Sequence, residues 1–158
     1  MAVITYLEAI RQALFDEMAR DERVVLLGED IGQNGGVFRA TDGALDRFGP
    51  QRVFDTPISE STIVGASVGL SVAGLVPVAE IQFGGFTMQA YHQLVGQLAR
   101  FRYRSRGRYE CPVTLRSAYG GTDAGSLSAR RMTHSGATSV GTKNVPRCFI
   151  AAITSSSR

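Results

Sequence analysis

The fold class follows from a short aliphatic run, Val24-Val25-Leu26-Leu27, which Gly28 closes. A run of this length without polar alternation predicts a strand that is buried on both faces, as in a parallel sheet. Further extended segments are predicted at 53–55, 76–81 and 113–116. Because helical segments lie between these runs, the sequence predicts an α/β domain with a parallel sheet and flanking helices.

The helical segments differ in character. The first begins with Thr5-Tyr6-Leu7-Glu8, which has capping-box spacing, and it is predicted to end near Asp21. The second, at 60–74, is rich in Gly, Ala and Ser. Since Gly weakens an exposed helix by about 1 kcal/mol, we expect this helix to pack closely and deep in the fold. The third helix is predicted over 86–104.

The turns after the strands are where the chemistry is expected. They fall at 28–36, 55–60, 82–86 and 117–121. In parallel sheets, ligands bind beyond the carboxyl ends of the strands. Residues of these turns are therefore the first candidates for a functional site.

The formal net charge of +3 comes from the end of the chain. Residues 1–121 carry 12 arginines against 13 acidic residues, whereas residues 122–158 carry five basic residues against one acidic residue. The charge is therefore no argument for nucleic-acid binding by the whole chain. The arginine run at 100–108 fits a helix C-terminus in a subunit contact, and we predict no nucleic-acid binding there.

No feature of the sequence predicts a membrane protein or a secreted one. No apolar run reaches the roughly 18 residues of a membrane span, and the first residues lack the pattern of a secretory signal. Two cysteines, Cys111 and Cys148, are too few for a disulfide framework. We therefore expect a cytoplasmic protein.

The composition changes near residue 122. Twelve of the last 37 residues are Ser or Thr, and Glu is absent from them. We predict a domain over 1–121 that is incomplete at its C-terminal end, followed by a divergent Ser/Thr/Arg-rich tail over 122–158 that is weakly ordered.

Five phrases of the sequence occur together in an order typical of one family. They are Leu26-Leu27-Gly28-Glu29-Asp30, Asp55-Thr56-Pro57-Ile58-Ser59-Glu60, Gly74-Leu75-Val76-Pro77, Gln82-Phe83-Gly84-Gly85-Phe86-Thr87-Met88-Gln89-Ala90 and Tyr103-Arg104-Ser105-Arg106-Gly107. Over about 2–121 the chain resembles the transketolase-like, pyrimidine-binding domain of the beta subunit of thiamine-diphosphate-dependent 2-oxo acid dehydrogenases. The resemblance is to the dehydrogenases of the pyruvate and branched-chain types. The resemblance implies an oxidoreductase component that serves oxidative decarboxylation of a 2-oxo acid and acyl transfer to a lipoyl group.

Glu60 is the catalytic residue that this resemblance implies. It matches the family's glutamate that faces the aminopyrimidine ring of thiamine diphosphate, where the carboxylate hydrogen-bonds ring nitrogen N1′ and starts a proton relay. Position alone allows a plainer interpretation. Glu60 would then be a first-turn acid that the helix dipole favours, with Ser59 as the N-cap.

Further residues are assigned to the same ring by the resemblance. Phe86 matches the aromatic residue that stacks on the aminopyrimidine, and Ile58 and Gln82 match positions near it. Glu29 matches acids that line a passage between paired sites, although an exposed loop acid is an equal interpretation. His92 has a plainer interpretation as a structural or interface histidine.

Metal ions and partner subunits are implied in the same way. Val113 matches the first of several positions whose carbonyls surround a potassium ion in the family. Magnesium and the diphosphate are held by an alpha subunit, and this chain has no Gly-Asp-Gly followed at a suitable distance by Asn. The resemblance thus implies a heterotetramer with alpha subunits and a second beta subunit, which serves a lipoyl acyltransferase core.

The match to the family fails after Gly121. The family has a His-Ser pair there that serves acyl transfer, but His134-Ser135 stands at another spacing, so we do not assign the histidine to it. The choice between pyruvate and branched-chain substrates stays open. Two alternatives also remain: a non-catalytic truncated fragment or interaction module, and another transketolase-like thiamine diphosphate enzyme such as a sugar ketol transferase.

Overall fold

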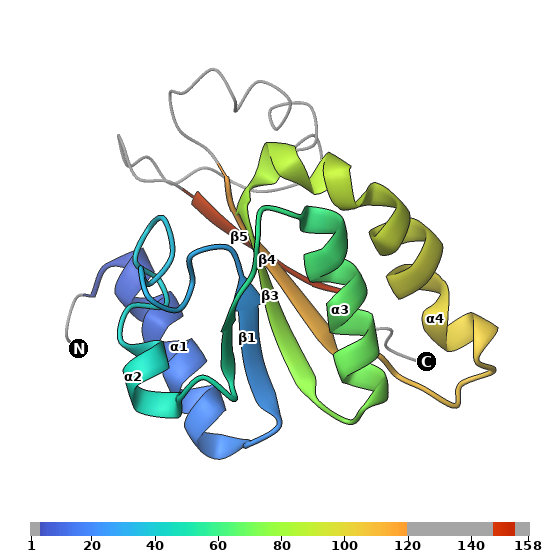
Figure 1. The fold of residues 1–158 in the computed structure, drawn as a ribbon, viewed down its shortest axis with the longest axis horizontal. Helices are drawn as coiled ribbons and strands as arrows, with labels where there is room; N and C mark the ends of the chain where they lie inside the picture. The colour runs from blue at the N-terminus through green and yellow to red at the C-terminus, as the bar shows by residue number, and fades with distance from the viewer. Residues whose placement is uncertain (1–3, 120–146, 154–158) are drawn as a thin grey trace.

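A computed structural model describes residues 4–119 and 147–153 of the chain. The strands in these residues form one sheet with the order β2-β1-β3-β4-β5 (Figure 1). The strands are β1 (Val24–Gly28), β2 (Val53–Asp55), β3 (Val76–Phe83), β4 (Val113–Tyr119) and β5 (Arg147–Ile153). The first four are parallel, and β5 pairs antiparallel to β4. The predicted α/β class and parallel sheet are therefore confirmed.

Helices lie on both sides of the sheet. α1 (Tyr6–Arg20) and α2 (Ala44–Phe48) lie on one side, and α3 (Glu60–Val72) and α4 (Ala99–Arg104) lie on the other (Figure 1). Each side has its own buried cluster. Leu27 of β1 packs in the cluster that contains Ile63 of α3, whereas Leu26 packs in the cluster that contains Met18 of α1. β1 is buried over all five residues because both of its faces are covered.

The capping box predicted at the start of α1 is present. The Thr5 hydroxyl accepts a hydrogen bond from the Glu8 backbone N–H at 3.2 Å. The Glu8 carboxylate accepts one from the Thr5 backbone N–H at 2.7 Å. Both contacts satisfy donors that a helix N-terminus leaves unpaired, and the helix ends at Arg20, as the sequence predicted.

Close packing explains one of the two glycines in α3. At Gly65, an added Cβ would lie 3.5 Å from the Gln93 side chain, so α3 and the following helix approach each other closely there. At Gly69, an added Cβ would meet nothing within 4 Å. The expectation of close packing therefore holds for Gly65 and is wrong for Gly69.

The segment predicted as one helix over 86–104 consists of three. A 3-10 helix η1 (Gly84–Ala90) is followed by a π-helix η2 (His92–Leu98) and then by α4. Apolar spacing alone does not separate these helix types here, because each element is too short for its period to be recognised. Single-turn π segments are frequent at functional sites, and this one follows the turn at 82–86.

Two more elements lie outside the sequence prediction. α2 is a helix of five residues that begins after Gly43 and ends before Gly49. β5 lies within the segment predicted as a weakly ordered tail and forms the edge of the sheet beside β4. The rest of that segment falls outside the described residues. Among the described helices, none has the length and apolar character needed to cross a membrane.

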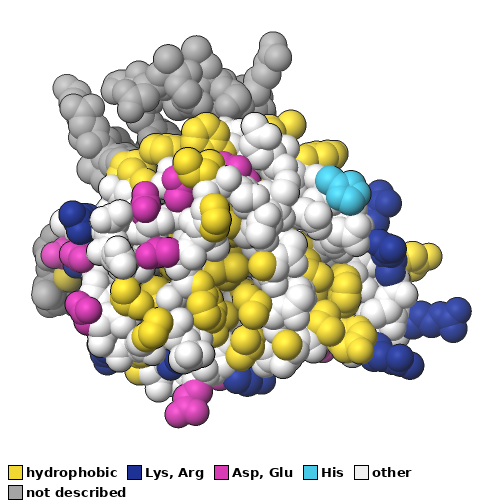
Figure 2. All heavy atoms as spheres, viewed as in Figure 1, with side chains coloured by type: hydrophobic (Ala, Val, Ile, Leu, Met, Phe, Trp, Pro, Cys, Tyr) yellow, Lys and Arg dark blue, Asp and Glu magenta, His cyan; other side chains and the backbone are white. Residues whose placement is uncertain are grey.

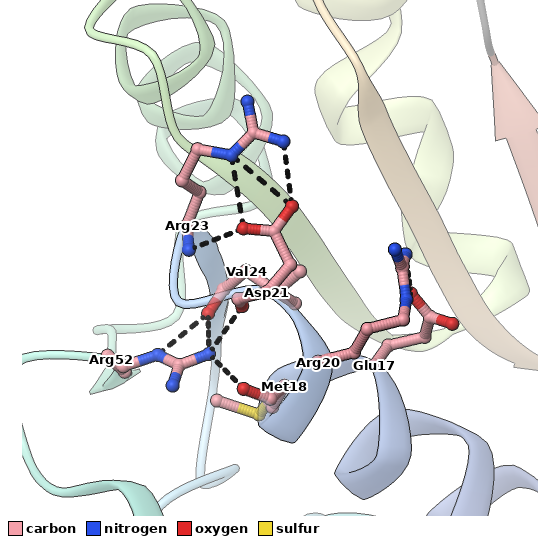
Figure 3. Close-up of polar contacts among 7 residues, drawn as sticks. All are labelled: Glu17, Met18, Arg20, Asp21, Arg23, Val24 and Arg52. Atoms are coloured by element: carbon pink, nitrogen blue, oxygen red, sulfur yellow. Dashed lines mark hydrogen bonds and ion pairs between the residues drawn. The ribbon is translucent and has the colours of Figure 1, made fainter.

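Arg52 connects the end of α1 to the start of β1 (Figure 3). Its Nη2 donates to the carbonyl oxygens of Met18 at 2.8 Å and Asp21 at 3.0 Å, and to that of Val24 at 2.9 Å. Its Nε donates to the same Val24 oxygen at 3.1 Å. The Met18 and Asp21 carbonyls lie at the C-terminal end of α1, where carbonyls lack a helical partner, and Val24 begins β1, so the guanidinium joins the helix end to the strand. By contrast, Arg20 pairs only with Glu17, and both side chains are largely exposed.

Replacing Arg52 with Met is expected to lower the free energy of unfolding by about 2 kcal/mol, since part-buried carbonyl oxygens would lose their donor. Urea denaturation followed by circular dichroism measures the change. Arg20→Met is the matched control, and it is expected to cost less than about 0.5 kcal/mol because its ion pair is exposed. An equal loss in both variants would contradict the role assigned to Arg52.

Candidate functional site

The candidate site lies at the carboxyl ends of β1 and β3, where Gly28 pairs with Glu80. The two strands are so close there that a Cβ on Gly28 would lie 2.8 Å from the Glu80 carbonyl oxygen. Only glycine fits this approach. The chain then leaves β1 at Glu29, so the position of this carboxylate is set by the pairing of the two strands.

Glu29, Glu60 and Gln82 converge at this point from three different elements. The pKa of the Glu29 carboxyl is raised, first by burial and then by the negative charges of Asp30 and Glu60. A hydrogen bond from the Gln82 side chain acts in the opposite direction and lowers it. Gln82 thus hydrogen-bonds Glu29, and Glu60 lies near enough for its charge to act on it. The Glu29 side chain is partly buried rather than fully exposed.

A bulge in β3 places Gln82. The register with β4 pairs Ile81 with Ser117 and Phe83 with Ala118, so Gln82 is an extra residue without a partner in the ladder. Bulges turn a side chain away from the regular alternation of a strand, and they are frequent beside active sites. The Gln82 side chain hydrogen-bonds Glu29, the first residue after the neighbouring strand β1.

Glu60 is the first residue of α3 and is half-buried. Ser59 occupies the N-cap position, but its side chain makes no capping hydrogen bond. Its Oγ lies 2.7 Å from Thr62 Oγ1 instead. Ser59 is therefore the N-cap residue, as the plainer interpretation of Glu60 has it, but its hydroxyl does not cap the helix. The next residue, Ser61, donates from Oγ to the Gln89 carbonyl oxygen at 2.6 Å and ties the first turn of α3 to η1.

Phe86 lies in η1 and remains 45% exposed, so one part of its ring is free for a ligand. The ring packs edge to face against Phe83, with centroids 5.7 Å apart. Ile58, also predicted near the ring, lies in the turn before α3 and is 77% exposed. The structure therefore leaves two apolar side chains uncovered at the end of the sheet that carries Glu60.

The other predicted residues lie apart from this group. Val113 is buried at the first residue of β4, the amino end of a strand that runs parallel to β1 and β3. It therefore belongs to the opposite edge of the sheet. His92 is exposed and lies against Gly96. His134 falls outside the described residues, among which no three His, Cys, Asp or Glu side chains gather into a metal site.

Sequence reasoning missed a buried ion pair next to the site. Arg116 of β4 donates from Nε to the Glu80 carboxylate at 2.8 Å, and a second contact to the same oxygen comes from Nη2. Both side chains are buried. Each charge stands inside a largely apolar strand, but the pairing of these two charges follows only from the alignment of β3 with β4.

Asp55 has a role in the loop after β1 that the sequence did not reveal. Its carboxylate accepts hydrogen bonds from the backbone N–H groups of Gly32 at 2.6 Å and Gln33 at 3.2 Å. The loop is further held by the Thr41 hydroxyl, which donates to the Ile31 carbonyl oxygen at 2.7 Å. Figure 2 shows acidic side chains gathered at the end of the molecule where this loop lies, whereas Lys and Arg gather along the α4 side.

Comparison with known proteins identifies the family. Residues 2–138 match the family described as "Transketolase, pyrimidine binding domain". The chain belongs to this family. The matched range covers all residues assigned to the candidate site, and it extends beyond the domain boundary predicted at 121.

Three similar curated proteins are named as beta subunits of dehydrogenases. The chain is 54% identical over 121 residues to the "Pyruvate dehydrogenase E1 component subunit beta" of Acholeplasma laidlawii, a match that covers 77% of this chain and 37% of that protein. It is 52% identical over 122 residues to the "3-methyl-2-oxobutanoate dehydrogenase subunit beta" of Mycobacterium tuberculosis, covering 77% and 35%. It is 46% identical over 127 residues to the "2-oxoisovalerate dehydrogenase subunit beta" of Bacillus subtilis, covering 80% and 39%. The chain thus spans less than half the length of these relatives.

The charge of Glu60 contributes to the raised pKa of Glu29, so Glu60→Gln is expected to lower the pKa of Glu29. Gln82→Ala is expected to raise it, because a hydrogen bond to the ionised form is lost. Carbon-detected NMR titration of 13C-labelled glutamate carboxyls measures both shifts. Glu22→Gln, at an exposed position, is the control and should leave the Glu29 titration unchanged. Shifts of the same sign in the Glu60 and Gln82 variants would contradict the arrangement.

Glu29→Gln is expected to raise the melting temperature at pH 7. A carboxyl whose pKa is raised in the folded state is harder to ionise there than in the unfolded chain. The resulting destabilisation is complete above the folded pKa and absent below the ordinary pKa of about 4.3. The advantage of Glu29→Gln should therefore disappear as the pH falls below about 4 in thermal melts recorded across this range. A constant difference at all pH values would contradict the sign of the shift.

Proposed function

We propose that this chain is the pyrimidine-binding part of a 2-oxo acid dehydrogenase beta subunit. It would contribute the aminopyrimidine half of a thiamine diphosphate site, for oxidative decarboxylation of a 2-oxo acid and acyl transfer to a lipoyl group. The observation that carries the proposal is the convergence of Glu60, Glu29 and Gln82 at the carboxyl end of the sheet, on the same edge as Phe86. The relatives named above support it.

The residues present fit an aminopyrimidine ring. Such a ring is flat and apolar on its faces and carries nitrogen atoms at its edge. Phe86 offers a partly exposed aromatic surface, and Ile58 a second apolar one. Glu60 offers a half-buried carboxylate that can accept a hydrogen bond from the protonated ring nitrogen. When bound, thiamine diphosphate supplies the nucleophilic carbon and the electron sink for decarboxylation.

Glu60 and Glu29 have different tasks in this proposal. Glu60 would accept a hydrogen bond from the protonated nitrogen at the edge of the ring, while Phe86 would orient the ring and exclude water from one side. Burial and the nearby charges of Asp30 and Glu60 make Glu29 harder to ionise, so Glu29 adds less negative charge beside the ring than an exposed carboxylate would. The Gln82 amide fixes the orientation of the Glu29 carboxylate.

The proposed partners come from the family resemblance. It assigns the diphosphate and magnesium to an alpha subunit, and the acidic side chains at this end of the molecule agree with that assignment. A second beta subunit and a lipoyl acyltransferase core complete the proposed assembly. The potassium site with the Val113 carbonyl stays a prediction, as does a cytoplasmic location. The relatives' names favour this function over that of a sugar ketol transferase.

The test is co-expression with the 2-oxo acid dehydrogenase alpha subunit of the same genome. We expect a soluble complex that binds thiamine diphosphate and decarboxylates pyruvate or a branched-chain 2-oxo acid. Glu60→Gln is expected to lower the turnover number at least about 100-fold, since a general acid–base group typically contributes that much. Glu22→Gln is the matched control and should retain full activity.

A soluble complex without decarboxylation would contradict the enzymatic proposal and favour a non-catalytic interaction module. Insoluble chain under all co-expression conditions would favour the truncated fragment. Undiminished turnover in Glu60→Gln would remove the mechanistic role of the carboxylate, even if the complex is active.

A further inference from the structure

Three phenylalanine rings form a chain beside the candidate site. Phe38, in the loop after β1, packs edge to face against Phe83, with ring centroids 6.0 Å apart and planes at 81°. Phe83 packs in the same way against Phe86, at 5.7 Å and 85°. Phe83 therefore contacts one aromatic ring on each side and connects the loop to the ring assigned to the cofactor.

These rings are not part of the core. Neither buried cluster contains any of the three, and Phe83 and Phe86 are 40% and 45% exposed. Packing against aliphatic side chains of the core therefore does not fix their orientation. Edge-to-face contacts between the rings do, because such contacts favour a narrow range of angles and distances.

The backbone between the rings gives little help in holding Phe86. Gly84 and Gly85 separate Phe83 from Phe86, and glycine restricts the backbone least of all residues. Phe83 itself is well placed, because it is the last residue of β3 and pairs with Ala118 directly after the bulge. The ring contact thus transfers the position of a strand residue to Phe86.

The loop on the other side of Phe83 is anchored as well. The Gly36 backbone N–H donates to the Asp30 carbonyl oxygen at 2.8 Å, and that of Thr41 donates to the Gly35 carbonyl oxygen at 3.0 Å. Arg39, next to Phe38, donates to the Asn34 carbonyl oxygen at 2.8 Å. Phe38 is therefore carried by a loop with internal hydrogen bonds on both sides of it.

We propose that Phe83 is a positioning residue for the cofactor. It holds the Phe86 ring in the orientation that receives the aminopyrimidine, and through Phe38 it ties this orientation to the loop after β1. The proposal rests on the proposed function, since it assigns Phe86 to the ring of thiamine diphosphate. It adds a residue that does not touch the cofactor but determines how tightly the cofactor binds.

The test measures the dissociation constant of thiamine diphosphate in the alpha–beta complex with magnesium, by isothermal titration calorimetry. Phe83→Leu keeps an apolar side chain and removes both ring contacts. We expect the dissociation constant to rise about three- to tenfold, as the loss of edge-to-face contacts predicts. The turnover number at saturating cofactor should change less than about twofold, because Glu60 is untouched.

Two variants separate positioning from a general structural effect. Phe83→Tyr keeps the ring and should restore the wild-type dissociation constant. Phe48→Leu removes an edge-to-face contact with Phe15 of very similar geometry, 5.6 Å and 88°, on the other side of the sheet. It should lower thermal stability without changing the dissociation constant.

A third variant tests whether the two consecutive ring contacts, of Phe38 with Phe83 and of Phe83 with Phe86, act together. Phe38→Leu should weaken cofactor binding less than Phe83→Leu does, because it leaves the contact between Phe83 and Phe86 intact. The double variant of Phe38 and Phe83 should bind about as well as Phe83→Leu alone, because both substitutions interrupt the same chain.

The outcomes distinguish this inference from the function on which it rests. An unchanged dissociation constant in Phe83→Leu, with wild-type complex that binds the cofactor, overturns the inference alone. An equal rise in Phe48→Leu overturns it too, since the effect would then be one of stability. A wild-type complex that does not bind thiamine diphosphate overturns the proposed function and the inference with it.

Discussion

At Gly28, β1 passes so close to β3 that no side chain would fit between the strands. An added Cβ would lie 2.8 Å from the Glu80 carbonyl oxygen and 3.1 Å from Cγ2 of Ile31. The Gly28 carbonyl oxygen accepts a hydrogen bond from the Thr56 N–H at 2.9 Å, so the turn after β2 meets the same point. The end of β1, the end of β3 and the turn after β2 are thereby fixed against one another. These segments carry Glu29 and Gln82 and lead to Glu60, so their contact determines where the three side chains lie.

This arrangement places like charges together, which opposes folding. Burial and the negative charges of Asp30 and Glu60 all disfavour ionised Glu29. The surrounding structure must offset this cost. The two buried clusters on either side of the sheet do so, and the buried pair of Glu80 with Arg116 connects β3 and β4 next to the site. Groups of like charges with shifted pKa values, such as Glu29 with Asp30 and Glu60, are common at functional sites because selection retains them for chemistry.

Much of the fold could be predicted because its signals are local. The capping box of Thr5 and Glu8 needs only four residues, and the aliphatic runs of β1 and β4 mark buried strands directly. The parallel sheet followed from the alternation of these runs with helical segments. The assignments of Glu60 and Phe86 came from the family resemblance, since a first-turn acid and a phenylalanine carry no functional signal by themselves.

What the sequence did not predict depends on register and on pairs distant in the chain. The bulge at Gln82 is invisible because its neighbours, Ile81 and Phe83, continue the apolar pattern of the strand. The pair of Glu80 and Arg116 joins residues on two strands, and the pairing exists only once these strands are aligned. The succession of 3-10, π and α helix after β3 escaped for another reason: their apolar periodicities overlap over so short a segment.

The exposure of the site residues bears on the proposal that a second polypeptide completes the site. An aromatic ring and a carboxylate that act on a cofactor need surroundings from which water is excluded, because electrostatic contacts weaken in water. Phe86 is 45% exposed and Ile58 77% exposed, while Met88 of η1 is 59% exposed. Within the described residues, Phe86 keeps this exposure although its ring packs against Phe83. In the proposed assembly, a surface of the alpha subunit would close over η1 and the start of α3 and supply the other side of the pocket.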